Sequence, residues 1–455
     1  MIYLTREKLS PLQMPTLVDP LISDPFPTEK TDVVIIGGGI IGVSAALTLA
    51  ERGISVTLCE KGEIGAEQSS RNWGWCRQQG RDPREIPLVM KSLERWAAMN
   101  ERVQGEVGFK RCGTLYLADS DQGLEAHGKW LEYAEPFGID TGLITATEVA
   151  KHLPGSSRTW HGALYCPTDG KAEPFVAAPT IARCAQKKGA TILTQTAALG
   201  LDISGGRVCG VLTENGLIRS DAVLLAAGAW SRLFCAHEQL LLPQLKVRSS
   251  VMRTGAIDAG LKSCISAPGF AIRPRADGGY TVAPNTAIWF ELTPDALRFI
   301  GLFSKLAWMA KGHLRLSIGN TFTEALRHHR KALAGEGEPF TAHRILDPAP
   351  VQPLLDKARA HLERDFPVFR DAVIAQQWAG MIDVTPDAVP VISEVSQQPG
   401  FFVATGFSGH GFGIGPAAGE LAADLIMNET PLVDPQPFRF SRFSDGSRIH
   451  PIIGI

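Results

Sequence analysis

The stretch Thr31–Lys61, TDVVIIGGGIIGVSAALTLAERGISVTLCEK, constrains the fold of this chain more than any other. An apolar run at Val33–Ile36 meets three spaced glycines. An Ala- and Leu-rich stretch with helical periodicity then leads to a second β-branched run ending at Glu60. This order predicts strand, turn, helix and strand, which is the βαβ unit of a dinucleotide-binding domain. The motif alone does not separate NAD from FAD.

The residues of this motif have separate physical tasks. Gly37 makes the tight turn, Gly39 lets the backbone approach a pyrophosphate, and Gly42 lets the helix pack closely on the strand. The phosphates would then face free N–H groups at the start of a helix, where the macrodipole favours negative charge. Glu60, at the tip of the second strand, suits the ribose hydroxyls of an adenosine. The alternative is a glycine turn in some other α/β protein.

Length and composition limit the function classes. A chain of 455 residues is too long for one ordinary core, so two domains are expected. With 45 basic and 47 acidic residues, nothing marks a nucleic-acid partner. No window approaches the ~20 apolar residues of a spanning helix, so no transmembrane segment is expected.

The cysteines are scattered through the sequence. There are eight of them, with no CxxC pair and no Cys/His cluster. This pattern predicts reduced, mostly buried thiols in a cytoplasmic protein, and neither a disulfide framework nor a metal site.

Further elements follow from periodicity and turn signals. Asp221–Gly228 is an almost wholly apolar run that predicts a strand buried in a parallel sheet. Near the end, the strand Gly400–Thr405, the glycine loop GFSGHGFGIGP and a helix at Ala417–Met427 repeat the logic of the N-terminal motif. Other predicted helices are Pro87–Asn100, Leu124–Phe137, Pro174–Gly189 and Leu297–Lys311, and other predicted strands include Cys112–Ala118, Ala190–Thr196, Val208–Thr213 and Leu245–Thr254.

Four stretches together resemble the D-amino-acid oxidase and glycine/sarcosine oxidase group of FAD-dependent oxidoreductases. They are GGGIIG with Glu60, the SSRNWG loop, DAVLLAAGAWS, and the tail TPDAVP…GFSGHGF. The resemblance implies an α/β fold, with a Rossmann-type FAD-binding domain and a discontinuous α+β substrate domain built on a mixed sheet. Residues 31–84, 158–240 and 375–430 would form the FAD domain, 85–157 and 241–374 the substrate domain, 1–30 an N-terminal arm and 431–455 a C-terminal tail.

The resemblance also implies which residues hold the cofactor. Those expected to contact or support FAD are Gly37, Gly39, Gly42, Glu60, Lys61, Ser69, Ser70, Arg71, Asn72, Ala198, Ala227, Gly228, Trp230, Gly380, Gly406, Gly409, His410, Gly411 and Phe412. Backbone N–H groups of the GHGF segment would lie near the pyrimidine edge of the flavin and stabilise negative charge there.

Three positions depart from the family pattern. Gly380 stands where the sarcosine-oxidase branch has a cysteine that tethers the flavin, so FAD is expected to be non-covalent. Gly413 stands where that branch has a lysine for the substrate carboxylate, and Thr281 aligns with a lysine that helps oxygen react. An acid substrate must therefore find another cation, and the acceptor need not be O2.

Arg77 and His410 are the candidate catalytic residues. Arg77 follows the SSRNWG segment in a stretch with two tryptophans, so it could clamp a substrate carboxylate. His410, between two glycines, could act as a base or could orient the loop. We favour the orienting role, because hydride transfer from a neutral amine needs no protein base.

The sequence therefore predicts FAD-dependent oxidation of a small amine or amino acid, by hydride transfer to flavin N5 and hydrolysis of the imine. O2 or a respiratory quinone-type carrier would accept the electrons. The alternatives are a 2-hydroxy-acid or polyol dehydrogenase on the same scaffold, and a flavin-binding subunit without a substrate site.

Overall fold

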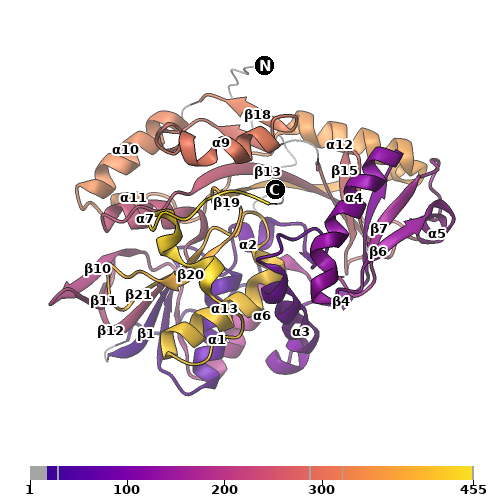
Figure 1. The fold of residues 1–455 in the computed structure, drawn as a ribbon. Coiled ribbons are helices and arrows are strands. Elements are labelled where there is room, and N and C mark those ends of the chain that lie inside the picture. The colour runs from indigo at the N-terminus through magenta and orange to yellow at the C-terminus, as the bar shows by residue number, and fades with distance from the viewer. Residues whose placement is uncertain (1–17, 28–29, 286–287, 320, 453–455) are drawn as a thin grey trace.

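The computed structural model describes residues 18–27, 30–285, 288–319 and 321–452. Two large β-sheets organise the chain, one of eight strands and one of ten. The eight-stranded sheet lies in the lower left of Figure 1, and the ten-stranded sheet extends above it and to the right.

The eight-stranded sheet has a parallel centre. β1 lies between β2 and β12, and its residue Ile35 is paired with Leu58 and Leu224. These residues are fully buried, which explains why the strands are continuous apolar runs and not alternating ones. The strands are β1 (Thr31–Ile36), β2 (Val56–Cys59), β9 (Thr191–Leu193), β10 (Ala198–Ser204), β11 (Arg207–Thr213), β12 (Gly216–Leu225), β20 (Val391–Glu394) and β21 (Phe401–Thr405).

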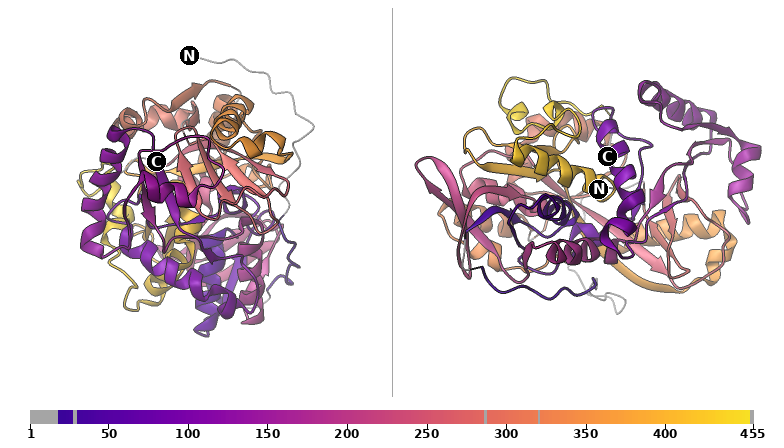
Figure 2. Two further views of the ribbon diagram at one scale, coloured as in Figure 1. Left: turned by 90° about the vertical axis from the view of Figure 1, so that its right-hand side faces the viewer. Right: turned by 90° about the horizontal axis from the view of Figure 1, so that it is seen from below.

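Four helices share one hydrophobic core with this sheet: α1 (Ile40–Glu51), α3 (Ile86–Val103), α6 (Pro174–Lys187) and α13 (Gly411–Met427). α13, drawn in yellow, lies beside the indigo α1 when the molecule is seen from below (Figure 2, right). The first and last thirds of the chain therefore pack together, and both helices begin at the same edge of the sheet.

The ten-stranded sheet is mixed. Its strands β13 and β19 pair antiparallel over their whole length, with Ser249 opposite Gly380. The strands are β5 (Thr114–Ala118), β6 (Gly142–Thr145), β7 (Gly162–Cys166), β13 (Leu245–Thr254), β14 (Cys264–Ala267), β15 (Phe270–Pro274), β16 (Tyr280–Ala283), β17 (Ile288–Glu291), β18 (Leu314–Ser317) and β19 (Ile374–Val384).

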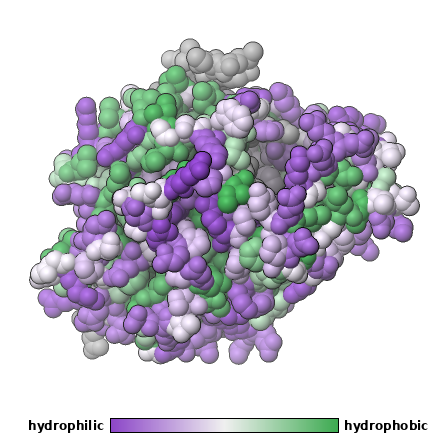
Figure 3. Space-filling view, viewed as in Figure 1, coloured by the Kyte–Doolittle hydropathy of each residue, from purple (hydrophilic) through white to green (hydrophobic). Residues whose placement is uncertain are grey.

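Helices of the segment 241–374 pack on this second sheet. α12 (Gln352–Asp365) shares a hydrophobic core with β15 and β16. α9 (Ile300–Met309) buries Phe303 and Leu306 and exposes Ile300 and Trp308, and Figure 3 shows hydrophobic residues gathered at the upper left, over α9 and α10. The other helices of residues 85–157 and 241–374 are α4 (Asp121–Ala134), α5 (Ala146–His152), α8 (Pro294–Arg298), α10 (Thr321–Leu333) and α11 (Glu338–Thr341).

Shorter elements complete the chain. A three-stranded sheet consists of β3 (Trp75–Cys76), β8 (Gly170–Lys171) and β4 (Lys110–Arg111). The short helices are α2 (Gln68–Arg71), α7 (Ser231–His237), η1 (Glu135–Phe137), η2 (Gly228–Trp230), η3 (Pro367–Asp371), η4 (Gln436–Phe438) and η5 (Phe440–Phe443). No helix within the described ranges is long and apolar enough to cross a membrane.

The predicted fold class is confirmed, and three predicted elements need correction. The helix predicted at Leu297–Lys311 is interrupted at Phe299, which ends α8 and precedes α9. The C-terminal helix begins at Gly411 and not at Ala417, with Pro416 inside it. The strand predicted at Ala190–Thr196 is limited to Thr191–Leu193, and the Gly205–Gly206 turn joins β11 to an additional strand, β10.

The predicted domain boundaries do not coincide with the sheet boundaries at two points. β7 and β19 were assigned to the FAD-binding segments, yet both pair in the ten-stranded sheet. Of the predicted N-terminal arm, residues 18–27 contain no helix or strand, and the Asp24 amide donates to the Ile192 carbonyl. Residues 1–17 and 28–29 of that arm lie outside the described residues. The domain division itself stays a prediction.

Candidate functional site

A cavity of about 310 Å³ lies where the carboxyl ends of β1, β2 and β12 meet the β13–β19 pair. Ile36, Cys59 and Ala226 contribute from the strand ends, and Ser249 and Gly380 from the opposite sheet. Ligands of parallel α/β sheets bind outside the carboxyl ends of the strands, so this is where a dinucleotide is expected.

Most of the residues predicted to hold FAD line this cavity. They are Gly37, Gly39, Glu60, Lys61, Ser69, Arg71, Asn72, Ala198, Ala227, Gly228, Trp230, Gly380, Gly409, His410, Gly411 and Phe412. Gly42, Ser70 and Gly406 do not line it. Ser70 is buried and donates to the Glu67 carbonyl, and the amide of Gly406 donates to the carboxylate of Asp383.

The glycine turn has the geometry that the motif predicts. Gly37 has a φ of +109°, and a Cβ there would lie 2.5 Å from the Ala226 carbonyl oxygen. A Cβ on Gly42 would lie 2.0 Å from the Gly37 carbonyl oxygen, so the close approach of α1 to β1 requires glycine. At Gly39 the nearest atom would be Ser69 Oγ at 3.1 Å. Ser69 Oγ also accepts from the Ile40 amide, so it holds the first turn of α1 in place.

Glu60 stands between the glycine turn and the next loop. One of its carboxylate oxygens accepts from the Gly38 amide and the other from the Gly62 amide, both at 2.7 Å. Each oxygen has a second lone pair, so the carboxylate is oriented by the backbone and can still accept from ribose hydroxyls.

Lys61 and Trp230 form a packed pair beside Glu60. The ammonium of Lys61 lies 3.1 Å from the centre of the Trp230 ring, and it donates to the His343 carbonyl. Burial lowers the pKa of Lys61 to about 8, opposed by the nearby carboxylate of Glu67. Glu67 also accepts from the Trp230 indole N–H at 3.1 Å, so this part of the wall is fixed by side-chain contacts.

A second helix N-terminus reaches the cavity from the other end of the chain. α13 begins at Gly411, with His410 as its N-cap, and Gly411, Phe412 and Gly413 line the wall. A Cβ on Gly413 would lie 3.0 Å from the Trp75 carbonyl oxygen. A lysine at this position would therefore displace β3, which gives a physical reason for the departure from the family pattern.

Arg71 and Asn72 are engaged mainly by the protein. The Arg71 guanidinium donates to the carbonyls of Ala66 and Ala379 and pairs with Asp347. The Asn72 side chain closes its own loop, by donating to the Gln68 and Ser69 carbonyls and accepting from the Gly74 amide. Both line the cavity, but neither side chain is left wholly to a ligand.

Two arginines lie at the aromatic end of the cavity. Arg77 and Arg81 line its wall together with Trp73 and Trp75. Arg77 donates to the Gln79 carbonyl, and its guanidinium lies 5.5 Å from the centre of the Tyr116 ring. Arg81 is 2% exposed, and its Nη1 has no hydrogen-bond partner among the described residues. Burial and the neighbouring Arg77 lower the pKa of Arg81 to about 9, so it stays protonated at neutral pH.

His410 and Glu85 are in contact beside these arginines. His410 Nδ1 lies 3.1 Å from a Glu85 carboxylate oxygen, and Glu85 is fully buried. Burial raises the pKa of Glu85 to about 8. Burial, followed by the charges of Arg81 and Arg77, lowers the pKa of His410 well below its usual value. At neutral pH both groups are therefore uncharged.

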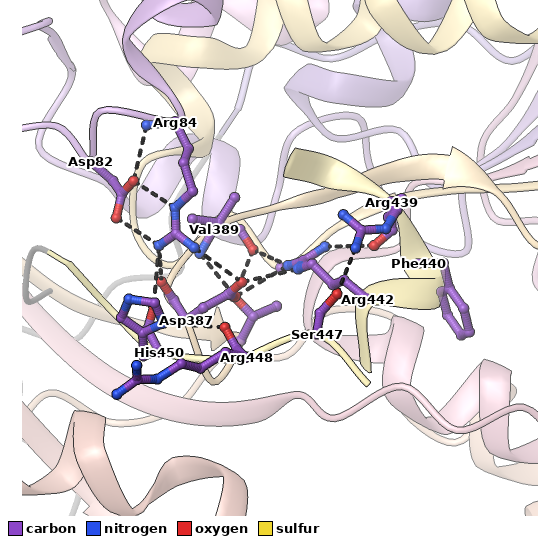
Figure 4. A network of polar contacts seen from close by, with 12 residues as sticks. Asp82, Arg84, Asp387, Val389, Arg439, Phe440, Arg442, Ser447, Arg448 and His450 are labelled. Atoms are coloured by element: carbon purple, nitrogen blue, oxygen red, sulfur yellow. Dashed lines mark hydrogen bonds and ion pairs between the residues drawn. The ribbon is translucent and has the colours of Figure 1, made fainter. Parts of the chain in front are cut away.

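A buried ion-pair network anchors the segment that carries Arg81 and Glu85. Arg84 pairs with Asp82, Asp387 accepts from Arg442 at 3.0 Å, and Arg84 lies 3.7 Å from Asp387 (Figure 4). Asp387 belongs to the TPDAVP motif and Arg442 to the C-terminal tail. The network therefore ties two distant parts of the chain to the segment that precedes α3.

Two further arginines, Arg273 on β15 and Arg275 just after it, lie away from the cavity. Arg273 is 1% exposed and pairs with Glu173 at 2.7 Å, and Arg275 pairs with Asp277 at 3.0 Å. Neither lines the cavity. The Thr281 hydroxyl accepts from both arginines and does not line the cavity. The residue at this position therefore does not indicate which electron acceptor is used.

Sequence reasoning missed Arg81, Glu85 and Asp383. Asp383 lines the cavity and accepts from the Gln244 side chain, the Thr405 hydroxyl and the Gly406 amide. Residues 77–85 form a loop with turns and no helix, so no local periodicity in the sequence points to Arg81 or Glu85.

The chain is similar in sequence and in structure to several known proteins. L-Amino acid deaminase from Proteus myxofaciens, solved in complex with anthranilate, is 31% identical with a TM-score of 0.89, over 95% of this chain and 97% of that one. L-Amino acid deaminase from Proteus vulgaris is 29% identical with a TM-score of 0.88, over 94% and 100%. The glycine oxidase of Pseudomonas aeruginosa is 26% identical over 89% of this chain and 97% of its own length.

The family profile described as "DAO: FAD dependent oxidoreductase" matches residues 32–425, which is most of the chain. The match spans both sheets and includes the glycine turn, the Arg77–Glu85 segment and the start of α13. The chain therefore belongs to the DAO family of FAD-dependent oxidoreductases.

Proposed function

We propose that the chain oxidises an L-α-amino acid at its C–N bond, with FAD bound non-covalently in the cavity described above. Gly37, Gly39 and the start of α1 would hold the phosphates, Glu60 the ribose, and the start of α13 the pyrimidine edge of the flavin. When bound, FAD supplies the acceptor for the hydride that leaves the substrate Cα. The resulting imine would be hydrolysed by water.

The observation that carries this proposal is the pair of guanidinium groups at the aromatic end of the cavity. Arg77 and Arg81 both line the wall, and the Nη1 of the buried Arg81 has no hydrogen-bond partner in the part of the chain that the structure describes. A buried charge without a partner is costly, and a ligand carboxylate would supply one. Planar guanidinium groups also bind carboxylates through two parallel hydrogen bonds.

The charge balance of this end favours an anion. Asp169 lies beside this end, where its carboxylate accepts from the Gln78 amide at 2.7 Å. Burial raises the pKa of Asp169 only to about 6, so this carboxylate is ionised at neutral pH. It offsets one of the two arginines, while Glu85 and His410 are uncharged. One positive charge remains for the substrate carboxylate, which would place the amino group and the Cα toward the middle of the cavity.

The relatives support the amino-acid assignment. Both structures with TM-scores near 0.9 are L-amino acid deaminases, and the profile spans the segments that build the cavity. The shared scaffold therefore favours an L-amino acid over a D-amino acid. We propose O2 or a quinone-type carrier as the electron acceptor.

Anaerobic mixing of the yellow holoenzyme with a substrate panel tests the proposal. The panel contains L-amino acids, their D-enantiomers, their amides and the matching 2-hydroxy acids. Bleaching of the flavin by L-amino acids, followed by reoxidation with O2 or a ubiquinone analogue, is expected. Bleaching by 2-hydroxy acids alone, or by no member of the panel, would overturn the assignment.

A further inference from the structure

Two cysteines lie side by side behind the aromatic wall of the cavity. The sulfur atoms of Cys112 and Cys264 are 3.8 Å apart, although the residues are 152 positions apart in the chain. Cys264 begins β14, which pairs parallel with β5, and its amide donates to the carbonyl of Gly113. Both cysteines pack in one small hydrophobic cluster with Trp75, which lines the cavity.

Neither Cys112 nor Cys264 has a role in the proposed reaction. Neither cysteine lines the cavity, and the described residues contain no group of three or more His, Cys, Asp or Glu side chains that could hold a metal ion. All eight cysteines are free and lie within the described ranges. Among the hydrogen-bond contacts of these thiols in the described residues, the contact of Cys112 with Cys264 joins two sulfur atoms, and the others join a sulfur to a nitrogen or an oxygen.

The two thiols have different environments. Cys112 is partly exposed, whereas Cys264 has no exposed surface. The hydrogen bond from Cys264 lowers the pKa of Cys112, with further help from the charge of Lys171 and the Cys264 amide. Burial raises the pKa of Cys264 well above its usual value. A partly exposed thiol with a lowered pKa beside a fully buried thiol is the arrangement of an attacking and a resolving cysteine.

We propose that Cys112 and Cys264 form a reversible disulfide when the protein meets a peroxide. The Cys112 thiolate would attack the O–O bond, giving a sulfenic acid and releasing hydroxide, which takes up a proton to become water. The Cys264 thiol would then attack the oxidised sulfur, forming the S–S bond and releasing a second water. Two thiols are oxidised by two electrons, and one hydrogen peroxide is reduced to two waters.

The geometry permits this bond with a local movement. The sulfurs must close from 3.8 Å to the ~2.05 Å of a disulfide, so bond formation requires a local movement of the two side chains. Gly113, between Cys112 and β5, has a φ of +71° and interrupts the strand there. The bond would link the start of β5 to the start of β14, directly behind Trp75.

Thiol counting on the native holoenzyme tests the proposal. The protein is treated with hydrogen peroxide, quenched, denatured, alkylated with N-ethylmaleimide and mapped by peptide mass spectrometry. The number of alkylated thiols should fall from eight to six, with a Cys112–Cys264 cross-linked peptide that dithiothreitol releases. Unchanged counts, or a cross-link between other cysteines, would refute the assignment.

Variants separate the two roles. Cys264→Ser should leave Cys112 as a sulfenic acid that dimedone traps, whereas Cys112→Ser should leave Cys264 as an alkylatable thiol. Cys209→Ser is the control, because the partly exposed Cys209 lies on β11 of the other large sheet, where its thiol donates to the Arg207 carbonyl. It should form the same cross-link as the unaltered protein. A stable sulfenic acid on Cys112 with Cys264 present would also contradict the proposal.

Discussion

The Nδ1 atom of His410 lies 3.1 Å from a carboxylate oxygen of Glu85, and both side chains are buried. His410 caps α13 and Glu85 caps α3, so this contact joins the starts of two helices at the cavity. A protonated Glu85 would donate the hydrogen bond to a neutral imidazole. The pair can therefore orient the GHGF segment without placing a charge opposite the substrate.

This pair predicts a specific pH dependence of stability. In the folded chain the pKa of Glu85 is raised from its usual 4.5 to about 8. Between these two pH values the folded chain therefore keeps a proton that the unfolded chain has released. The free energy of unfolding should therefore fall as pH rises across this window. His410 has the opposite shift, and its contribution rises with pH only up to its usual pKa of 6.5. Between pH 6.5 and about 8 the slope from Glu85 should approach ~1.4 kcal/mol per pH unit.

Urea unfolding of Glu85→Gln and of the unaltered protein at both ends of that window measures this slope. The variant should lose the part of the slope that Glu85 contributes. A variant with the original slope would show that Glu85 is already ionised in the folded chain.

Asp387 should be critical for stability because it neutralises Arg442. Arg442 is 4% exposed and bonds to both oxygens of Asp387. Asp387→Ala would strand this buried guanidinium, at an expected cost of about 3–5 kcal/mol. Thermal and urea unfolding of the holoenzyme measure the loss.

Asp445→Ala is the matched control for that prediction. It removes a surface partner of Arg439, at a side-chain exposure near one third, and should change stability little. Equal effects of the two substitutions would mean that burial of the Asp387 pair is not what stabilises the tail.

The part of the fold that follows local patterns could be predicted from the sequence. The βαβ unit at residues 31–61 and the end of β12 consist of continuous apolar runs next to glycines. The start of α13 could not be predicted, because Gly411, Gly415 and Pro416 are poor helix formers. Tertiary packing overrides this: a Cβ on Gly415 would lie 2.7 Å from the Ile40 side chain, so close contact with α1 requires a glycine there.

The residues of the site also fall into those that the sequence predicts and those that it does not. Glu60 and the glycines belong to a motif with fixed spacing, whereas Arg81 and Glu85 look like ordinary surface residues in the sequence. Their burial depends on long-range packing, such as the bond from the Trp130 indole to the Arg81 carbonyl and the contact of Glu85 with His410. Burial of charged groups by distant elements leaves no local pattern to detect.

Glu60 should set the affinity for FAD. Glu60→Ala removes the acceptor for the ribose hydroxyls and leaves the Gly38 and Gly62 amides without their partner. The expected loss is about 1.5–3 kcal/mol, or roughly tenfold or more in FAD affinity. Titration of the apoprotein with FAD, followed by flavin fluorescence, measures it. Glu51→Ala, at the far end of α1, serves as the control, and an unchanged affinity in Glu60→Ala would remove Glu60 from the site.

FAD should be released by acid. Gly380 lies on the cavity wall in the position of the tethering cysteine of the sarcosine-oxidase branch, so the chain offers no thiol there. Trichloroacetic acid should therefore precipitate a colourless protein and leave yellow FAD in the supernatant. Flavin that stays with the pellet would show a covalent bond elsewhere.

Arg77 and Arg81 should bind the carboxylate of the substrate. Arg77→Ala and Arg81→Ala should each weaken binding of the acid by roughly a hundredfold, or ~2.7 kcal/mol, because each removes a partner from a desolvated ion pair. Arg81→Lys should recover only part of this, since an ammonium cannot form the planar fork. Arg275→Ala, which breaks a pair outside the cavity, is the control.

The most direct measurement is the apparent dissociation constant from anaerobic stopped-flow reduction of the flavin. It is determined for the best L-amino acid of the panel and for its uncharged amide. Arg77→Ala and Arg81→Ala should weaken binding of the acid strongly and binding of the amide little, with the flavin spectrum unchanged. Equal weakening of acid and amide, or normal binding of the acid, would contradict this prediction.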